Sequence, residues 1–182
     1  TEKFNYDLPE HLIAQYPSIQ RADSKLLVAL ESIQHQVFKD IENYLDKGDL
    51  LILNKTSVIP ARLFGEKITG GKIELLLERF LSNHQTLTQI RSSRTPKEGA
   101  ELVFSFQGQR FLATVEGRQD NFFILNWSDD PKYLFEQYGQ IPLPPYMNRA
   151  AEKLDEERYE TIYADPNQKA SVAAPTAGMH FD

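Results

Sequence analysis

The strongest constraint on the fold of this chain is a series of short strand-like segments between residues 65 and 139, separated at regular intervals by turns. The strand-like segments are Lys67-Ile68 and residues 73–80, 87–90, 102–106, 111–115 and 122–127. The turns between them contain glycine or asparagine, which tight turns favour. Six short strands with little helix between them are typical of a small antiparallel barrel. We therefore predict an inserted β-barrel-like domain over residues 65–139.

The sequence on either side of this region has α/β patterning. Helical spacing is found after Asp7 and at residues 38–45, 131–138 and 155–163, and apolar strand candidates at residues 26–30 and 49–53. The continuous apolar run at 49–53 is expected to be buried on both faces. We predict that residues 1–64 and 140–182 form the first part of a discontinuous α/β domain, incomplete in this chain. Because an inserted domain needs its two ends close together, Arg62 and Pro142 should be neighbours.

The composition excludes several kinds of site. The chain has no cysteine, which rules out disulfides, thiolate metal ligands and a cysteine nucleophile. Its four histidines lack metal-ligand spacing, and no glycine-rich phosphate loop is present. The longest apolar run, at residues 50–53, is far too short to span a membrane. We expect a soluble, cytoplasmic protein that holds no metal.

The charge is unevenly distributed along the chain. The net charge of −6 argues against a uniformly basic nucleic-acid-binding protein. Residues 55–97, however, contain eight lysines and arginines against three glutamates. This stretch fits either a surface that meets phosphate groups or a solvated strand face, and the sequence leaves both open.

A first polar segment, residues 54–62, follows the apolar run. Ligands in α/β folds sit at the carboxyl ends of strands, where Asn54 and Thr56 can form hydrogen bonds with a ligand. Arg62 can hold a carboxylate or a phosphate through two parallel hydrogen bonds. The alternative is a capped turn with Arg62 on the surface.

A second segment, residues 141–149, has three prolines in four residues. Prolines stiffen the backbone into an extended form, which would present Tyr146 for stacking on a base. The alternatives are a partner-binding proline stretch and a rigid linker between domains.

A third segment, residues 171–181, combines small residues with Thr176, Gly178 and His180. A glycine allows a ligand to approach the backbone closely, and a neutral histidine exchanges protons near pH 7. The alternative is a tight turn with a structural histidine.

Taken together, these segments resemble the queuosine ribosyltransferase-isomerase family. The resemblance runs in order through FNYDLPEHLIAQYP, RADSKLL, GDLLILNKTSVIPARLFGEK, TGGKIELLLER, IPLPPYMNR, YETIYA and VAAPTAGMHF. Each piece is short, but their order and spacing span the whole chain, which makes the combined match highly specific. The chain departs from the family pattern at Ser57, where arginine is usual, at Ala170, where glycine is usual, and at Lys55, where asparagine or aspartate is usual.

The resemblance implies both a fold and a reaction. The implied fold is an α/β domain with an inserted β-barrel-like domain. In the implied reaction, the ribosyl part of S-adenosylmethionine is transferred to 7-aminomethyl-7-deazaguanine at the tRNA wobble position and isomerised. Adenine and methionine leave, and epoxyqueuosine-tRNA forms. S-adenosylmethionine is then a co-substrate, no cofactor is bound, and tRNA carrying the precursor base is the partner.

The resemblance also suggests roles for the matching residues. We expect His180 to transfer a proton and Arg62 to hold the methionine carboxylate or a tRNA phosphate. The remaining candidates are Asn54, Thr56 and Thr176 for sugar hydroxyls or the adenine edge, Tyr146 for stacking, and Arg149, Arg91 and Arg94 for the anticodon backbone. We expect a monomer that does not engage membranes. Because members of the family are longer, we expect the 182 residues alone to be inactive.

Two other functions remain open at this point. A non-catalytic RNA-binding module would explain the predicted barrel and the cation-rich stretch. An adaptor that docks through PLPPY would explain the prolines, although nothing else in the sequence supports it.

Overall fold

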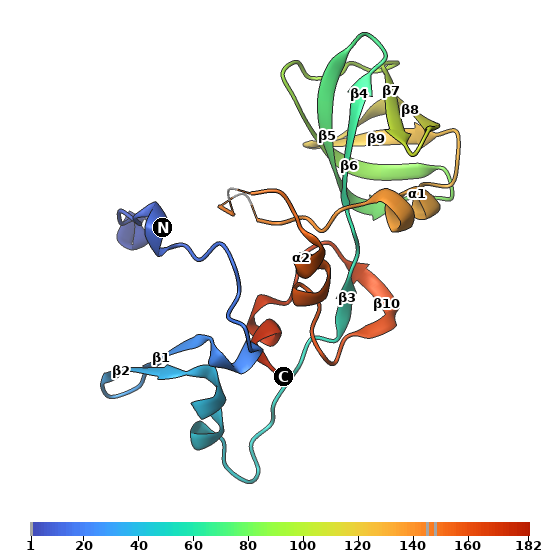
Figure 1. Cartoon of the computed structure of the whole chain (residues 1–182). Helices are drawn as coiled ribbons and strands as arrows, with labels where there is room; N and C mark the ends of the chain where they lie inside the picture. The colour runs from blue at the N-terminus through green and yellow to red at the C-terminus, as the bar shows by residue number, and fades with distance from the viewer. Residues whose placement is uncertain (1, 145, 148) are drawn as a thin grey trace. The chain divides into compact units, whose positions relative to one another are not determined.

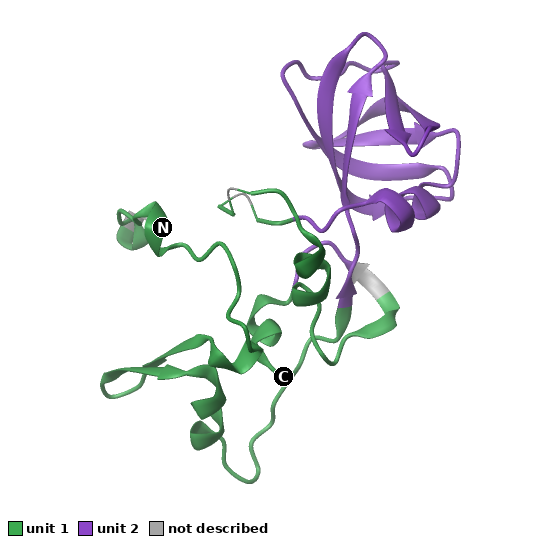
Figure 2. Ribbon diagram, viewed as in Figure 1, with its two compact units in different colours: residues 1–56, 143–168, 175–182 green, residues 57–142, 169–174 purple. Residues whose placement is uncertain are grey.

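The computed structural model describes residues 2–144, 146–147 and 149–182, and it divides into two compact units (Figures 1 and 2). Unit 1 comprises Thr1–Thr56, Leu143–Gln168 and Pro175–Asp182, and unit 2 comprises Ser57–Pro142 and Lys169–Ala174. Unit 2 contains a closed antiparallel barrel, and unit 1 contains elements of a partial α/β domain. The predicted fold class is thereby confirmed. The predicted domain borders at residues 65 and 139 stay a prediction.

Six strands close the barrel in the order β4-β5-β6-β9-β8-β7, and each pairs antiparallel with its neighbours. They are β4 (Arg62–Lys67), β5 (Gly71–Phe80), β6 (Gln85–Ser92), β7 (Glu101–Phe106), β8 (Gln109–Gln119) and β9 (Phe122–Trp127). In β5 the side chains of Ile73, Leu75 and Leu77 are buried, while Lys72 is exposed and Glu74 half-buried. This period of two places one face of the strand in the barrel core and the other in solvent.

Aromatic side chains fill the barrel core. The rings of Phe104 and Trp127 lie 5.1 Å apart, and both residues are buried. The indole Nε1 of Trp127 donates a hydrogen bond to Thr86 Oγ1 at 2.8 Å, and Thr86 is also fully buried. This bond satisfies the one polar atom of the indole, which would otherwise be costly to bury.

The helix α1 (Pro131–Tyr138) follows the last barrel strand, as its sequence predicts. The carboxylate of Asp130 caps it by accepting a hydrogen bond from the Lys132 amide at 2.9 Å. Its buried residues Leu134 and Phe135 belong to the barrel core cluster.

The chain enters and leaves the barrel at neighbouring residues. Beyond α1, Gln140 exchanges two backbone hydrogen bonds with Arg62, at 2.8 and 3.0 Å. The residues just before Pro142 thus lie beside the first strand of the barrel, as the insertion argument requires.

Unit 1 consists mainly of short elements. Its hairpin pairs β1 (Lys25–Ala29) with β2 (Ile33–Val37), and its one α-helix among the described residues is α2 (Lys153–Arg158). The short 3-10 helices are η1 (Glu2–Phe4), η2 (Glu10–Leu12), η3 (Arg21–Asp23), η4 (Phe38–Tyr44) and η5 (Thr176–His180). A further two-stranded parallel sheet pairs β3 (Thr56–Val58) with β10 (Asp165–Ser171), and the division into units falls within both strands.

Two sequence predictions for unit 1 are wrong. The helix expected after Asp7 is only the single turn of η2, in which no residue is buried. The strand expected at residues 49–53 is not formed, and Leu50 and Ile52 are 85% and 83% exposed. An apolar run forms a buried strand only when other elements cover it, and the described residues place no cover on these two side chains.

Candidate functional site

The segment after Leu53 is a turn stabilised by its own side chains. Asn54 Oδ1 accepts hydrogen bonds from the Thr56 amide at 3.0 Å and from Thr56 Oγ1 at 2.7 Å. The expected position at the carboxyl end of a buried strand is wrong, because residues 49–53 form no strand. The turn instead leads into β3, where Ser57 is buried. Asn54 and Thr56 are therefore brought together, and each already has a structural partner.

Arg62 opens the first barrel strand. Its Nε lies 3.1 Å from Glu74 Oε1, and the side chains of the pair are 19% and 27% exposed. Glu74 faces the same side of the sheet from the neighbouring strand β5. Within the chain, the carboxylate that Arg62 contacts is thus that of Glu74, a partner that the sequence reading did not identify.

The proline-rich segment presents Tyr146 in unit 1. The tyrosine side chain is 59% exposed, while Pro145, one of the three prolines expected to support it, lies outside the described residues. The next residue, Met147, accepts a hydrogen bond at its sulfur from the Tyr159 hydroxyl at 2.8 Å. An exposed ring on a chain segment anchored beside it has the geometry of a stacking platform.

Arg149 is paired inside unit 1 with a residue that the sequence did not single out. Its Nη1 and Nη2 donate to Asp155 Oδ2 and Oδ1 at 2.6 and 2.7 Å, and its Nε donates to the Gln15 carbonyl at 2.8 Å. The Asp155 side chain is only 1% exposed. The guanidinium also lies over the Tyr16 ring, 4.5 Å from its centroid. This cluster fixes the segment after Tyr146 to α2 and to the N-terminal segment.

Hydrogen bonding shifts the pKa values of this cluster. The hydrogen bonds from Arg149 lower the pKa of Asp155 below its ordinary value, against an opposing effect of burial. The hydroxyl of Tyr16 donates to Glu152 Oε1 at 3.0 Å, which raises the pKa of Tyr16. The carboxylate of Asp155 therefore stays ionised and keeps Arg149 in place. The sequence signal for Asp155 was its place near the start of a predicted helix.

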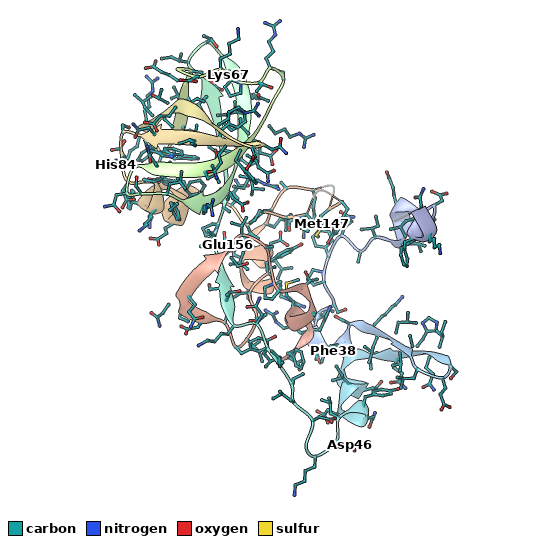
Figure 3. The ribbon with its side chains drawn as sticks, turned by 180° about the vertical axis from the view of Figure 1, so that it is seen from behind. Phe38, Asp46, Lys67, His84, Met147 and Glu156 are labelled. Atoms are coloured by element: carbon teal, nitrogen blue, oxygen red, sulfur yellow. The ribbon has the colours of Figure 1, made fainter. Side chains whose placement is uncertain are left out.

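The C-terminal loop holds Thr176 and His180 in one 3-10 turn, η5. Thr176 is exposed, whereas His180 is half-buried, with its ring centroid 5.3 Å from that of Phe38. Figure 3 labels Phe38, which begins η4 and also makes an edge contact with the Phe181 ring at 4.9 Å. Burial lowers the pKa of His180 below its ordinary value, so that the imidazole is neutral at pH 7.

Two further contacts shape this loop. Arg21 donates to the Met179 carbonyl at 3.0 Å and to the Glu157 carbonyl at 2.9 Å, which ties η3 to η5 and to α2. A Cβ added at Gly178 would overlap the Tyr163 hydroxyl, so a larger residue there would require that tyrosine side chain to shift. Arg21 and Tyr163 were noted in the sequence only as parts of motifs. Their contacts with the loop could not be inferred from spacing.

Arg91 and Arg94 belong to unit 2, on β6 and on the loop that follows it. Both are exposed. The carbonyl of Arg94 accepts a hydrogen bond from Ser92 Oγ at 2.7 Å and another from Lys67 Nζ. These contacts hold the loop beside the barrel and leave the two guanidinium groups on its outer surface.

The family model of the queuosine biosynthesis proteins matches residues 1–182, the whole of this sequence. The chain belongs to this family. An S-adenosylmethionine:tRNA ribosyltransferase-isomerase of Acinetobacter baylyi is 47% identical over 182 residues, which cover 98% of this chain and 52% of that protein. The protein of the same name from Acinetobacter baumannii is 45% identical over 181 residues, with the same coverage.

A solved structure, the S-adenosylmethionine tRNA ribosyltransferase of Thermotoga maritima, is 34% identical to this member of the family. The match covers 80% of this chain and 52% of that one, with a TM-score of 0.39. The chain thus spans about half the length of the curated relatives it matches.

The candidate residues of this queuosine biosynthesis protein fall into both units. Unit 1 contains Asn54, Thr56, Tyr146, Arg149, Thr176 and His180, and unit 2 contains Arg62, Arg91 and Arg94. Within the described parts of the chain, no group of three or more histidine, aspartate or glutamate side chains is arranged to hold a metal ion. None of the described helices is long and apolar enough to cross a membrane.

Proposed function

We propose that this chain supplies part of an S-adenosylmethionine:tRNA ribosyltransferase-isomerase. The enzyme transfers the ribosyl group of S-adenosylmethionine to 7-aminomethyl-7-deazaguanine at the tRNA wobble position and isomerises it. Adenine and methionine are released, and epoxyqueuosine-tRNA is formed. The observation that supports this most is the identity of 45–47% to proteins of that name across 98% of the chain. The enzyme acts as a cytoplasmic monomer, and S-adenosylmethionine is consumed without any bound cofactor.

The proposed chemistry needs a group that moves a proton next to the sulfonium, whose positive charge acidifies the neighbouring carbon. His180 fits this role because burial keeps its imidazole neutral and able to accept a proton at pH 7. Thr176 begins the same turn and is exposed, so its hydroxyl is accessible to a sugar hydroxyl or the adenine edge.

The remaining candidates, except Arg149, bind substrate in this proposal. Tyr146 stacks on adenine or on the modified base, and the Asn54–Thr56 turn orients sugar hydroxyls. Arg62 holds the methionine carboxylate or a phosphate, and the contact of its Nε with Glu74 fixes the guanidinium. Arg91 and Arg94 meet the anticodon backbone. Arg149 acts indirectly, because its guanidinium is engaged by Asp155 and thereby positions the segment that bears Tyr146.

The proposal is tested by measuring adenine release from S-adenosylmethionine in the presence of precursor tRNA. Two samples are compared: the 182-residue chain alone, and the same chain fused to the part of the Acinetobacter baylyi relative that lies beyond the match. We expect release by the fusion and none by the chain alone, because the chain spans about half of that relative. The intact relative serves as positive control. A fusion that folds but releases no adenine contradicts the proposal.

The closed barrel also favours a second candidate function, that of a non-catalytic RNA-binding module. Calorimetry with S-adenosylmethionine separates the two candidates. The fused enzyme should bind S-adenosylmethionine, and a plain RNA-binding module should show no heat of binding.

A further inference from the structure

The outer face of the barrel has a groove over β4, β5, β6 and β7. Two adjoining hollows of about 440 Å³ each share Phe64, Lys72 and Ile73 in their walls. The remaining lining residues are Gly65, Glu66, Val103 and Ser105 in one hollow, and Glu74, Arg91, Ser92 and Ser93 in the other. All of these residues belong to unit 2.

An aromatic ring lies on the solvent side of the sheet in this groove. Phe64 is 46% exposed although it belongs to a strand whose inward residue Leu63 is fully buried. The strand register places Phe64 opposite Glu74 and Glu74 opposite Arg91, so the three form one row across the outer face. Leaving a phenylalanine in solvent is unfavourable, whereas an exposed ring beside charged groups is suited to stacking on a planar ligand.

Cations and hydroxyl groups surround this ring. Lys72 and Arg91 line the groove with Ser92 and Ser93, and both cations are exposed. Of the two carboxylates in the groove, Glu74 is paired with Arg62 at 3.1 Å, which offsets its charge.

The loop after β6 begins at the lining residue Ser93 and contains further cations. It contains Arg94 and Lys97, both exposed. Lys67, labelled on the barrel in Figure 3, holds this loop to β4 through the Arg94 carbonyl. The groove therefore combines an aromatic platform with the exposed cations Lys72 and Arg91, against one carboxylate, Glu66, besides the paired Glu74. An aromatic ring beside cations is the combination that binds unpaired nucleotides of RNA.

We propose that this groove binds an unpaired stretch of RNA, with a base stacked on Phe64 and the adjoining phosphates at Lys72 and Arg91. The inference rests on the proposed action on tRNA and assigns part of the RNA contact to the barrel. The carboxylate of Glu74, fixed by Arg62, accepts hydrogen bonds from an amino or imino group of the stacked base. A duplex offers no exposed base face, so the groove selects unpaired loops over stems.

The test measures binding of a fluorescently labelled RNA hairpin with an unpaired loop to the 182-residue chain by anisotropy. A blunt duplex with the same stem is the comparison ligand. We expect the hairpin to bind more tightly than the duplex, and Phe64→Ala to weaken hairpin binding about tenfold. Phe64→Leu should also weaken it, because an aliphatic side chain keeps apolar area without a stacking face. Arg91→Gln should lower the slope of log Kd against log salt by about 0.7.

Matched controls lie on another strand of the same barrel. Leu112 on β8 is 43% exposed, close to the exposure of Phe64, and Arg110 on β8 is exposed like Arg91. Leu112→Ala and Arg110→Gln should leave hairpin binding within twofold of wild type. Unfolding followed by the fluorescence of Trp127, the one tryptophan of the chain, verifies that each variant keeps its barrel.

Each outcome decides between the groove and the wider function. If the hairpin binds but the Phe64 and Arg91 variants behave like the controls, the groove assignment is wrong while the tRNA substrate stands. If no RNA binds the chain while the fused enzyme still releases adenine, the groove assignment is again wrong and the function stands. If neither RNA binding nor adenine release is found, both fail. Loss of self-association in Phe64→Ala, without an effect on RNA, assigns the groove to a protein contact instead.

Discussion

Arg149 and Asp155 form a two-pronged ion pair, with 2.6 Å between Nη1 and Oδ2 and 2.7 Å between Nη2 and Oδ1. The same carboxylate accepts a hydrogen bond from the Glu152 amide at 2.8 Å, at the start of α2. The buried Asp155 thus caps the start of α2 and also holds Arg149, which lies three positions after the exposed Tyr146. Removing one partner of such a pair leaves the other charge buried without compensation.

Asp155→Asn should therefore destabilise unit 1 by about 3 kcal/mol. The measurement is urea unfolding followed by far-ultraviolet circular dichroism, with Trp127 fluorescence recorded in parallel. Because Trp127 lies in the barrel, its fluorescence reports the unfolding of unit 2, and the urea midpoint of that transition should be unchanged. Glu156→Gln, an exposed change on the same helix, is the control and should alter stability by less than about 0.5 kcal/mol. An equal effect of the two changes would show that the ion pair contributes little.

The contribution of Asp155 should also depend on pH in a defined direction. Hydrogen bonds from Arg149 lower its folded-state pKa below the ordinary 3.8, so the stabilisation is present above that value. It is lost as the pH falls through the lowered pKa, because the folded state must then take up a proton. The difference in urea midpoint between wild type and Asp155→Asn should thus be constant near neutrality and shrink below pH 3.8. A difference that persists unchanged into strong acid would contradict this account.

The hydrogen bond between Trp127 and Thr86 gives a prediction for the barrel. Thr86→Val keeps the shape of the side chain but leaves the buried indole Nε1 without its acceptor, which should cost about 2 kcal/mol. Thr88→Val is the matched control, since Thr88 is equally buried and its hydroxyl donates only a 3.4 Å bond to the Phe123 carbonyl. Urea unfolding monitored by Trp127 fluorescence measures both, and we expect the loss for Thr86 to exceed that for Thr88.

The barrel could be predicted from sequence because its signals are local. Alternation in β5 and a turn residue between each pair of strands are properties of a few neighbouring residues. The α1 helix was equally predictable, because Asp130, Pro131 and Gly139 mark its two ends.

The parts that could not be predicted depend on distant partners. The apolar run at 50–53 has the composition of a buried strand, but burial depends on elements that cover it. Asp155 and Arg149 lie six positions apart on either side of a helix start, and no periodic pattern marks them as a pair. The candidate residues Arg149 and His180 were identified in the sequence, whereas their partners Gln15, Asp155 and Phe38 came only from the folded arrangement.

Gly139 ends α1, where the chain leaves the barrel, and a side chain at this position should destabilise the fold. A Cβ at this position would overlap the carbonyl oxygens of Pro60 and Phe135, neither of which can move without disturbing the barrel entry. Gly139→Ala should therefore destabilise unit 2 by about 3 kcal/mol, as overpacking against backbone does. Gly117→Ala is the control, because a Cβ at Gly117 meets nothing within 4 Å. Trp127 fluorescence in urea measures both variants, and equal midpoints would overturn the steric argument.

His180 yields a prediction that links packing to protonation. Burial against Phe38 lowers the pKa of His180 below its ordinary 6.5, so its proton NMR titration should have a midpoint below that value. The signal is assigned by its loss in His180→Gln. Because the unfolded chain binds the His180 proton more tightly than the folded chain does, protonation favours unfolding. The folded state therefore has its full stability above pH 6.5 and loses part of it as the pH falls towards the folded-state pKa of His180. Phe38→Ala opens the imidazole to water and should move the midpoint back towards 6.5. If the midpoint in Phe38→Ala equals that of wild type, burial by Phe38 is not what keeps His180 neutral, and its proposed part in proton transfer loses its physical basis.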